Sequence, residues 1–115
     1  MSAITSPVSD MLITVKSREV QRALQAEMRG DRTDAKQHFL AAAHLELVLA
    51  KVYEAAGDVE LASRSRISAA SCFWRAGQAE RGREVFAFLA QNAAVSGEEV
   101  QQLIAGLSQN YGNGE

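Results

Sequence analysis

The stretch AKVYEAAGDVELA, at residues 50–62, combines two small residues and a glycine at defined spacings. Ala50 is followed seven residues later by Gly57, and Ala62 follows five residues after that. The same spacing occurs in two other series, Ala23, Gly30, Ala35 and Ala70, Gly77, Gly82. Glycine commonly ends a helix at positive φ, and small residues let two helices approach closely. The three series therefore predict three helix–turn–helix corners and a stack of antiparallel helices.

The composition favours a single all-α domain. The chain has 115 residues, enough for one hydrophobic core, and it is rich in residues that favour helix. Its single proline, Pro7, lies near the start and interrupts no later helix. We expect one domain over residues 1–108. The last residues, QNYGNGE at 109–115, have no apolar periodicity and are expected to form a disordered tail.

Apolar periodicity and capping signals indicate about five helices. Asp31 and Asp58 follow their glycines as N-caps, and Ser96 with Glu99 matches a capping box. The second helix is apolar around most of its circumference, so we expect its neighbours to enclose it at the centre of the domain. The expected helices span residues 8–29, 32–56, 59–75 and 79–92, with a fifth after Ser96.

Two of these helices have a distinct apolar face. On the first, the predicted buried residues are Ile13, Val20, Leu24 and Met28, with Ala23 beside them. On the last, the apolar stripe consists of Val100, Leu103, Ile104 and Leu107. Each helix alone would be marginally stable in water, so these faces are expected to share one core.

Charge and cysteine content limit the classes of partner. The formal net charge of −2 provides no general attraction to nucleic acid or to an anionic membrane. No run of eighteen apolar residues and no secretory signal pattern is present in the sequence. Cys72 is the only cysteine and cannot form an internal disulfide, which favours a reducing compartment. We therefore expect a cytoplasmic protein that binds neither nucleic acid nor membrane.

The corners and their flanking residues resemble the tetratricopeptide-like superfamily of helical repeats. The resemblance covers about residues 23–89. It implies a right-handed stack of helical hairpins that binds a protein or peptide on a concave face. The residues that carry it are Ala35, Phe39 and Ala42 after Gly30, then Tyr53, Gly57, Ala62 and Ala69, then Phe73, Gly77, Gly82 and Phe86.

This sequence also departs from the pattern of that superfamily. The glycines are 27 and 20 residues apart, whereas the repeat has about 34 residues. The closing proline is absent, and Arg66 stands where an aromatic residue is expected. Each helix must therefore belong to two successive hairpins. An unrelated compact helical bundle is the alternative fold for the same residues.

No pattern of residues indicates catalysis or a cofactor. His38 and His44 are six residues apart and do not share a helix face, and no E-x-x-H motif accompanies them. Cys72 lacks a base positioned by sequence, and we interpret it as a structural, partly buried residue. No phosphate-binding loop or catalytic triad is present in the sequence. We expect a chain that is not an enzyme and needs no metal or cofactor.

Arginines around the third helix are the candidate binding residues. Together with nearby serines they suit a phosphate, a carboxylate tail or an acidic peptide. The alternative is a solvated arginine face paired with nearby glutamates. Trp74, the only tryptophan, is either an exposed interface anchor or a core residue. The cluster comprises Arg64, Arg66, Arg75, Arg81 and Arg83, and the candidate partner-binding residues are Arg64, Arg66, Trp74, Arg75 and Arg81.

These expectations lead to three functional hypotheses. The first is a small adaptor or scaffold that holds a partner helix or peptide against the second and third helices, with arginines contacting its acidic groups. The second is a self-associating helical bundle with no catalytic role, in which the amphipathic first or last helix completes a homodimer. The apolar run Met11–Val15 near the end of the chain motivates it. The third is a ligand-binding or enzymatic helical domain, which no residue pattern requires.

Overall fold

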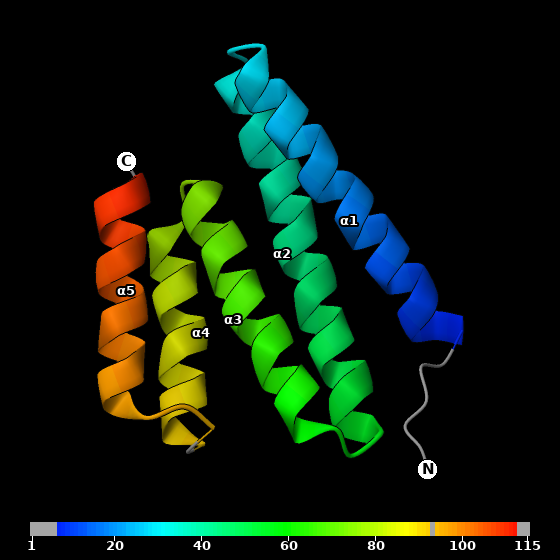
Figure 1. Cartoon of the computed structure of the whole chain (residues 1–115), viewed down its shortest axis with the longest axis vertical. Coiled ribbons are helices and arrows are strands. Elements are labelled where there is room, and N and C mark those ends of the chain that lie inside the picture. The colour runs from blue at the N-terminus through cyan, green and yellow to red at the C-terminus, as the bar shows by residue number, and fades with distance from the viewer. Residues whose placement is uncertain (1–6, 93, 113–115) are drawn as a thin grey trace.

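The computed structural model describes residues 7–92 and 94–112, which form five α-helices. No strand occurs within these ranges, so the predicted all-α class is confirmed. Successive helices run antiparallel (Figure 1). The helices are α1 (Pro7–Met28), α2 (Arg32–Ala55), α3 (Val59–Arg75), α4 (Ala79–Gln91) and α5 (Gly97–Tyr111).

The three glycine corners have the predicted geometry. Gly30, Gly57 and Gly77 have φ angles of 79°, 82° and 80°, in the region that side chains disfavour. Each helix before a corner ends with its carbonyl groups bonded by the amides of the turn. At the second corner, for example, the Asp58 amide donates to the Tyr53 carbonyl oxygen at 2.9 Å. The chain therefore reverses direction at each glycine.

Side-chain caps start most of the helices that follow a turn. Asp31 and Asp58 each accept a hydrogen bond of 3.1 Å from the backbone amide three residues on. Ser96 accepts one of the same length from the Glu99 amide at the start of α5. Gln78 precedes α4 and makes no side-chain cap bond. The predicted N-caps of α2, α3 and α5 are therefore confirmed.

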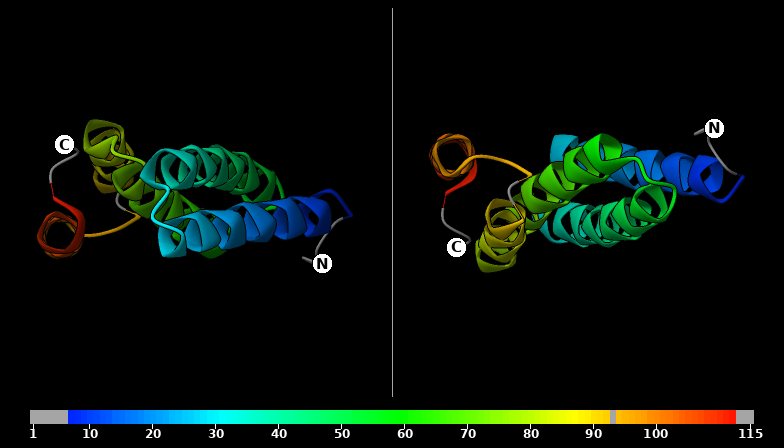
Figure 2. Two further views of the ribbon diagram at one scale, coloured as in Figure 1. Left: turned by 90° about the horizontal axis from the view of Figure 1, so that it is seen from above. Right: turned by 90° about the horizontal axis from the view of Figure 1, so that it is seen from below.

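The helices form a thin two-layer array. α2 packs between α1 and α3, α3 also packs against α4, and α5 contacts α3 and α4. The views in Figure 2 show α2 and α4 towards one face, and α1 and α5 towards the other. The Cα atoms extend 45 × 33 × 15 Å, and the shortest extent fits two layers at an interaxial distance of about 8–10 Å. Each helix therefore has a side that faces away from the other layer.

The buried side of α1 consists of small residues. Ala23 and Ala26 have no exposed area, whereas Leu24 is 40% exposed and Met28 87% exposed. The expectation that Leu24 and Met28 lie on the buried face was wrong. Within the described ranges the backbone of α1 packs closely against α2 alone, and alanines allow the closest approach. α3 reaches α1 through a side-chain contact, from Arg75 to Glu27. No neighbour remains to cover the larger side chains.

α2 is flanked rather than enclosed. Val48 is 48% exposed, Leu47 is half-buried, and His44 and Lys51 are exposed. The expectation that neighbours surround this helix was therefore wrong for one edge. In a two-layer array, α1 and α3 cover two sides of α2 and leave a third side open. This open edge contributes to the site described below.

The largest buried side chains are on α2, α3 and α4. The main cluster joins Trp74, Phe86 and Leu89 to Val95 and to Val100 of α5. Burying each large apolar side chain stabilises the fold by roughly 1.5–3 kcal/mol. The side chains that are almost fully buried include Trp74, Phe39, Phe73, Phe86, Leu49 and Leu89.

α5 extends further than the sequence indicates. The helix continues to Tyr111, so the predicted disordered tail from residue 109 begins three residues too early. Leu107 packs against the main cluster, and Trp74 Nε1 donates to the Gly112 carbonyl oxygen at 2.7 Å. These tertiary contacts hold the last turn in a helix. Residues 113–115 of the expected tail lie outside the described ranges.

Candidate functional site

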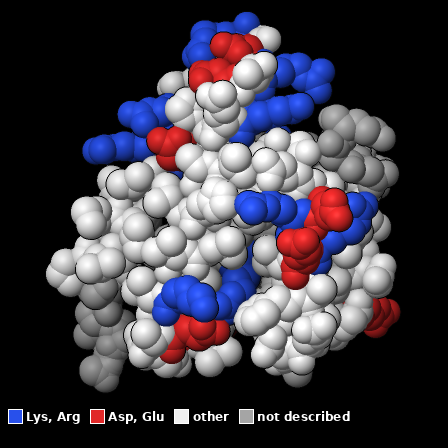
Figure 3. Space-filling model, turned by 180° about the vertical axis from the view of Figure 1, so that it is seen from behind, with Lys and Arg blue, Asp and Glu red and all other residues white. Residues whose placement is uncertain are grey.

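A groove of about 240 Å³ lies on the face that carries α2 and α4. α3 forms its floor, because α2 and α4 each pack against α3 and not against each other. Figure 3 views the molecule from this side and shows a hollow in mostly uncharged surface, with basic and acidic atoms beside it. The residues that line the groove are Leu47 and Lys51 of α2, Arg66 of α3, and Glu84, Val85 and Phe88 of α4.

Helical spacing places the apolar lining of this α2–α4 groove. Val85 and Phe88 are three residues apart on α4 and therefore share a face. Leu47 and Val85 are partly buried against a cluster that includes Phe73 and Ala69 of α3. Phe88 is 43% exposed. The walls of the groove on α2 and α4 thus present apolar side chains, one of which is an exposed aromatic ring.

Arg66 closes one side of the groove and is not available as a free charge. It is 8% exposed, and its Nη1 donates to Glu54 Oε2 at 3.0 Å. Its guanidinium carbon lies 4.7 Å from the centre of the Phe88 ring, in a cation–π contact. The hydrogen bond from Arg66 lowers the pKa of the Glu54 carboxyl. The guanidinium therefore links α3 both to the end of α2 and to α4.

Lys51 is the cation that remains available at the groove. It makes no direct ion pair within the described part of the chain, and its side chain is exposed. Its charge contributes, after Arg66, to the lowered pKa of the Glu54 carboxyl. Glu84 also lines the groove. The groove therefore combines an apolar centre with charges of both signs at its edges.

The other predicted arginines do not join Arg66. Arg64 donates to Glu60 at 3.1 Å on an exposed part of α3. Arg81 lies over the Phe73 ring at 5.6 Å and lines neither the groove nor the pocket around Arg75. The expected single arginine face is therefore not formed. Arg64 and Arg66 are on the same turn of α3 but contact different neighbours, and Arg81 is on α4. Closeness in sequence therefore does not bring these arginines into one site.

Trp74 and Arg75 lie together but away from the groove. Trp74 is 1% exposed, which makes it a core residue and not an exposed anchor. Arg75 lies between two aromatic rings, 4.3 Å from the centre of Phe39 and 4.9 Å from that of Tyr111. Its Nη2 donates to Glu27 Oε1 at 3.1 Å. Glu27, Trp74, Arg75 and Tyr111 line a second pocket.

The surroundings of the two histidines and of Cys72 indicate structural roles. His38 Nδ1 lies 2.7 Å from Glu19 Oε1, and this contact lowers the pKa of the Glu19 carboxyl. His44 is exposed and meets the Phe73 ring edge-on at 5.4 Å. Burial raises the pKa of the Cys72 thiol to about 11, so it is protonated at neutral pH. Within residues 7–92 and 94–112, no group of three or more His, Cys, Asp or Glu residues is placed to hold a metal ion.

Sequence reasoning did not single out Glu46, the buried carboxylate of α2. It is 5% exposed and lies 3.4 Å from Lys16 Nζ of α1. Burial raises the pKa of Glu46, and the charge of Lys16 and a hydrogen bond from Ser65 act in the opposite direction. Glu46 thus connects α1, α2 and α3. Its only signal in the sequence is a carboxylate within an otherwise apolar run.

Comparisons with known proteins give no assignment. No protein-family model matches the chain, no curated protein matches it, and no solved structure matches it. None of the helices in the described ranges is both long enough and apolar enough to cross a membrane. A functional assignment must therefore come from the surfaces themselves, and the α2–α4 groove is lined largely by apolar surface.

Proposed function

We propose that this chain is a protein-interaction module whose α2–α4 groove holds an amphipathic helix of a partner protein. The observation that carries the proposal is the exposed Phe88 ring, which lies in an apolar groove beside the exposed cation of Lys51. Exposed aromatic residues in pockets often dominate binding energies at interfaces. A partner helix supplies apolar side chains at one face and charges beside them.

The apolar contact supplies most of the binding energy in this proposal. A bulky side chain of the partner enters between Leu47, Val85 and Phe88 and covers the exposed part of the aromatic ring. Complete burial of such a side chain contributes about 1.5–3 kcal/mol. Because Arg66 already bonds Glu54, it shapes the groove and does not pair with the partner.

The charges select the orientation of the partner. Lys51 pairs with a carboxylate one turn from the partner's apolar side chain, and Glu84 on the opposite wall disfavours a second carboxylate there. The partner we propose is therefore an amphipathic helix with one acidic edge. The mechanism is shape and charge recognition, with no chemical step.

A tetratricopeptide-like relationship and a cytoplasmic location belong to the same proposal. Support for the relationship comes from three glycine corners joining antiparallel helices, and from α3 serving as the floor between two walls. In this interpretation the chain acts as an adaptor or scaffold.

Selection of helical peptides from a random library on the immobilised full chain tests this function. We expect enriched sequences with a bulky apolar residue and an Asp or Glu one turn away. Binding should weaken at least about tenfold with Phe88→Glu. Met28→Glu is the matched control, because Met28 is 87% exposed at the end of α1. Selected peptides that bind both variants equally would place the interface elsewhere.

Self-association is the second candidate, favoured by exposed apolar residues at the start of α1. Val8 is 51% exposed and Met11 59% exposed, and within the described ranges the backbone of α1 packs closely against α2 alone. In this interpretation a second copy covers these side chains. Sedimentation equilibrium should then show a dimer that Met11→Glu dissociates. A monomer at all concentrations would remove this candidate.

A further inference from the structure

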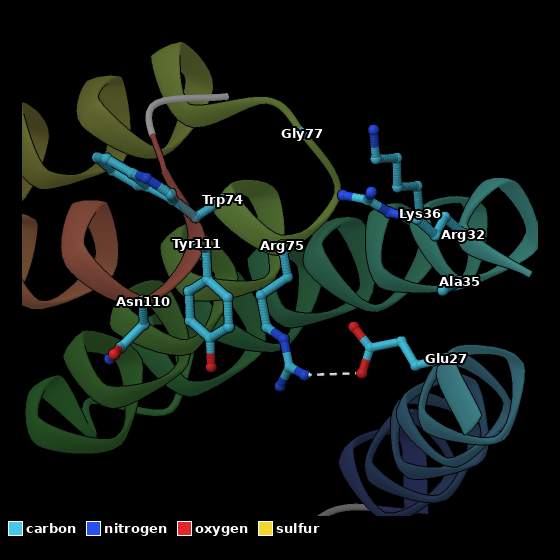
Figure 4. Close-up of a pocket in the computed structure, with 9 residues that line it drawn as sticks. All are labelled: Glu27, Arg32, Ala35, Lys36, Trp74, Arg75, Gly77, Asn110 and Tyr111. Carbon is cyan, nitrogen blue, oxygen red and sulfur yellow. Dashed lines mark hydrogen bonds and ion pairs between the residues drawn. The ribbon is translucent and has the colours of Figure 1, made fainter. Parts of the chain in front are cut away.

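A second pocket, of about 300 Å³, lies where the ends of four helices meet. Glu27 comes from the end of α1, Arg32 and Lys36 from the start of α2, Arg75 from the end of α3 and Tyr111 from the end of α5. Figure 4 shows Glu27, Arg75 and Tyr111 next to one another, with Arg32 and Lys36 projecting from α2 near Gly77. The volume of the pocket is at the lower end of the range of about 300–1,000 Å³ for small-molecule sites.

Positive charge predominates in this four-helix pocket. Three cations, Arg32, Lys36 and Arg75, face one carboxylate, Glu27, which leaves two positive charges in excess. Glu27 bonds Arg75 at 3.1 Å, whereas Arg32 and Lys36 have no ion-pair partner within the described residues. The Arg75 Nε atom is buried and has no hydrogen-bond partner. The pocket therefore holds unneutralised positive charge.

The positions of Arg32 and Lys36 make the electrostatic potential of the pocket more positive. Both lie in the first two turns of α2, where the helix dipole is positive and disfavours cations. Lys36 Nζ lies next to the Gly77 corner, 3.4 Å from where a Cβ atom at residue 77 would be. An anion in the pocket would be attracted both by the side chains and by the dipole.

We propose that this pocket binds a small phosphate monoester. The phosphate lies between Arg32, Lys36 and Arg75, and the organic part lies against Tyr111. A phosphate monoester carries about −1.5 to −2 charges at pH 7, which matches the excess of two positive charges better than a carboxylate does. Guanidinium groups and lysine are the usual donors to phosphate oxygens.

Ligand binding at this pocket also restrains α5. Asn110 and Tyr111 form its wall on that helix, and the remaining wall belongs to α1, α2 and α3. A phosphate monoester bound there would connect the last turn of α5 to the start of α2. Amide hydrogen exchange in residues 107–111 should therefore slow when the ligand is present.

Titration of phenyl phosphate into the full chain, followed by NMR amide shifts, tests the proposal. Inorganic phosphate and benzoate are the comparison probes. We expect saturable shifts near Arg32, Lys36 and Tyr111, with phenyl phosphate binding more tightly than either comparison probe. Benzoate binding as tightly as phenyl phosphate, or no saturable shifts at millimolar phenyl phosphate, would overturn the assignment.

Matched variants localise the binding. Arg32→Gln and Lys36→Gln should each weaken phenyl phosphate binding about tenfold, because each removes one charge-assisted hydrogen bond. Arg64→Gln is the control, because Arg64 is exposed and pairs only with Glu60. Circular dichroism verifies that each variant folds. Unchanged affinity in the Arg32→Gln, Lys36→Gln double variant would contradict the proposal, and this result is independent of the α2–α4 groove.

A phosphorylated peptide tests the source of the phosphate. A short phosphoserine peptide and phosphoserine itself carry the same charged group. The proposal of a small-molecule site predicts that phosphoserine binds at least as tightly as the peptide. Tighter binding of the peptide, lost in the Lys36→Gln variant, would replace it with a phosphopeptide site.

Discussion

Trp74 Nε1 donates a 2.7 Å hydrogen bond to the carbonyl oxygen of Gly112, which lies 38 residues further along the chain. The indole is 1% exposed, so this bond joins the end of α5 to the centre of the main core cluster. The apolar residues of α5 beyond Val100 are only partly buried against that cluster. This hydrogen bond, together with the contact of Arg75 with the Tyr111 ring, therefore attaches the last turn of α5.

Replacing Trp74 with Phe should loosen α5 before the other helices. Trp74→Phe removes the hydrogen bond and leaves a cavity beside Phe86, which together should lower the free energy of unfolding by about 1–3 kcal/mol. Urea denaturation measures this loss, and hydrogen exchange shows where it acts. Exchange that accelerates equally in α2 and in α5 would contradict a local role for this bond.

Two glycines within helices should respond to alanine in opposite ways. At Gly82 a Cβ atom would lie 2.7 Å from Trp74 Cε3 and 3.0 Å from the Ala70 carbonyl oxygen, so Gly82→Ala should destabilise the fold by about 1–3 kcal/mol. At Gly106 nothing lies within 4 Å, and Gly106→Ala should stabilise α5 by about 0.5–1 kcal/mol. Thermal unfolding of the two variants measures both effects. Similar melting temperatures would contradict close packing of α3 against α4.

The arginines of α3 should differ in their effect on stability. Arg66→Ala should lower the free energy of unfolding by about 1–3 kcal/mol, because the buried side chain packs on Phe88 and bonds Glu54. Arg64→Ala should leave the free energy unchanged within measurement error, because its pair with Glu60 is exposed. Chemical denaturation distinguishes them. Equal losses of unfolding free energy in the two variants would contradict the buried position of Arg66 and its contacts with Phe88 and Glu54.

The buried Glu46 should give the fold a specific pH dependence. Burial raises its pKa above the ordinary value of 4.5, so the folded chain retains a proton that the unfolded chain has already released. Stability from this group therefore falls as pH rises from about 4.5 through the raised pKa. In Glu46→Gln this fall should be absent, as measured by urea denaturation at intervals of roughly one pH unit between about pH 4 and 8. An identical profile in both proteins would contradict the burial of an ionisable group at this position.

The corners were predictable because their signals are local. Gly57 takes a positive φ and Asp58 caps the next helix through atoms only a few residues away. The ends of α3 agree with the sequence prediction for the same reason. Such contacts depend on neighbours in the chain and therefore leave a pattern in the sequence.

The sites were not predictable, because they depend on which helix faces which. Ala23, rather than Leu24, faces α2, and apolar character alone does not distinguish them. Arg66 is buried because Glu54 and Phe88 meet it from two other helices. The four-helix pocket joins residues from the first and last helices. A signal for it exists only in the two basic residues near the start of α2.

The most direct test of the α2–α4 groove is an NMR shift map with a selected helical peptide. We expect the largest amide shifts at Leu47, Lys51, Val85 and Phe88, and we expect Phe88→Glu to abolish them. Largest shifts around Tyr111 or along the outer side of α1, with these residues unaffected, would contradict this expectation.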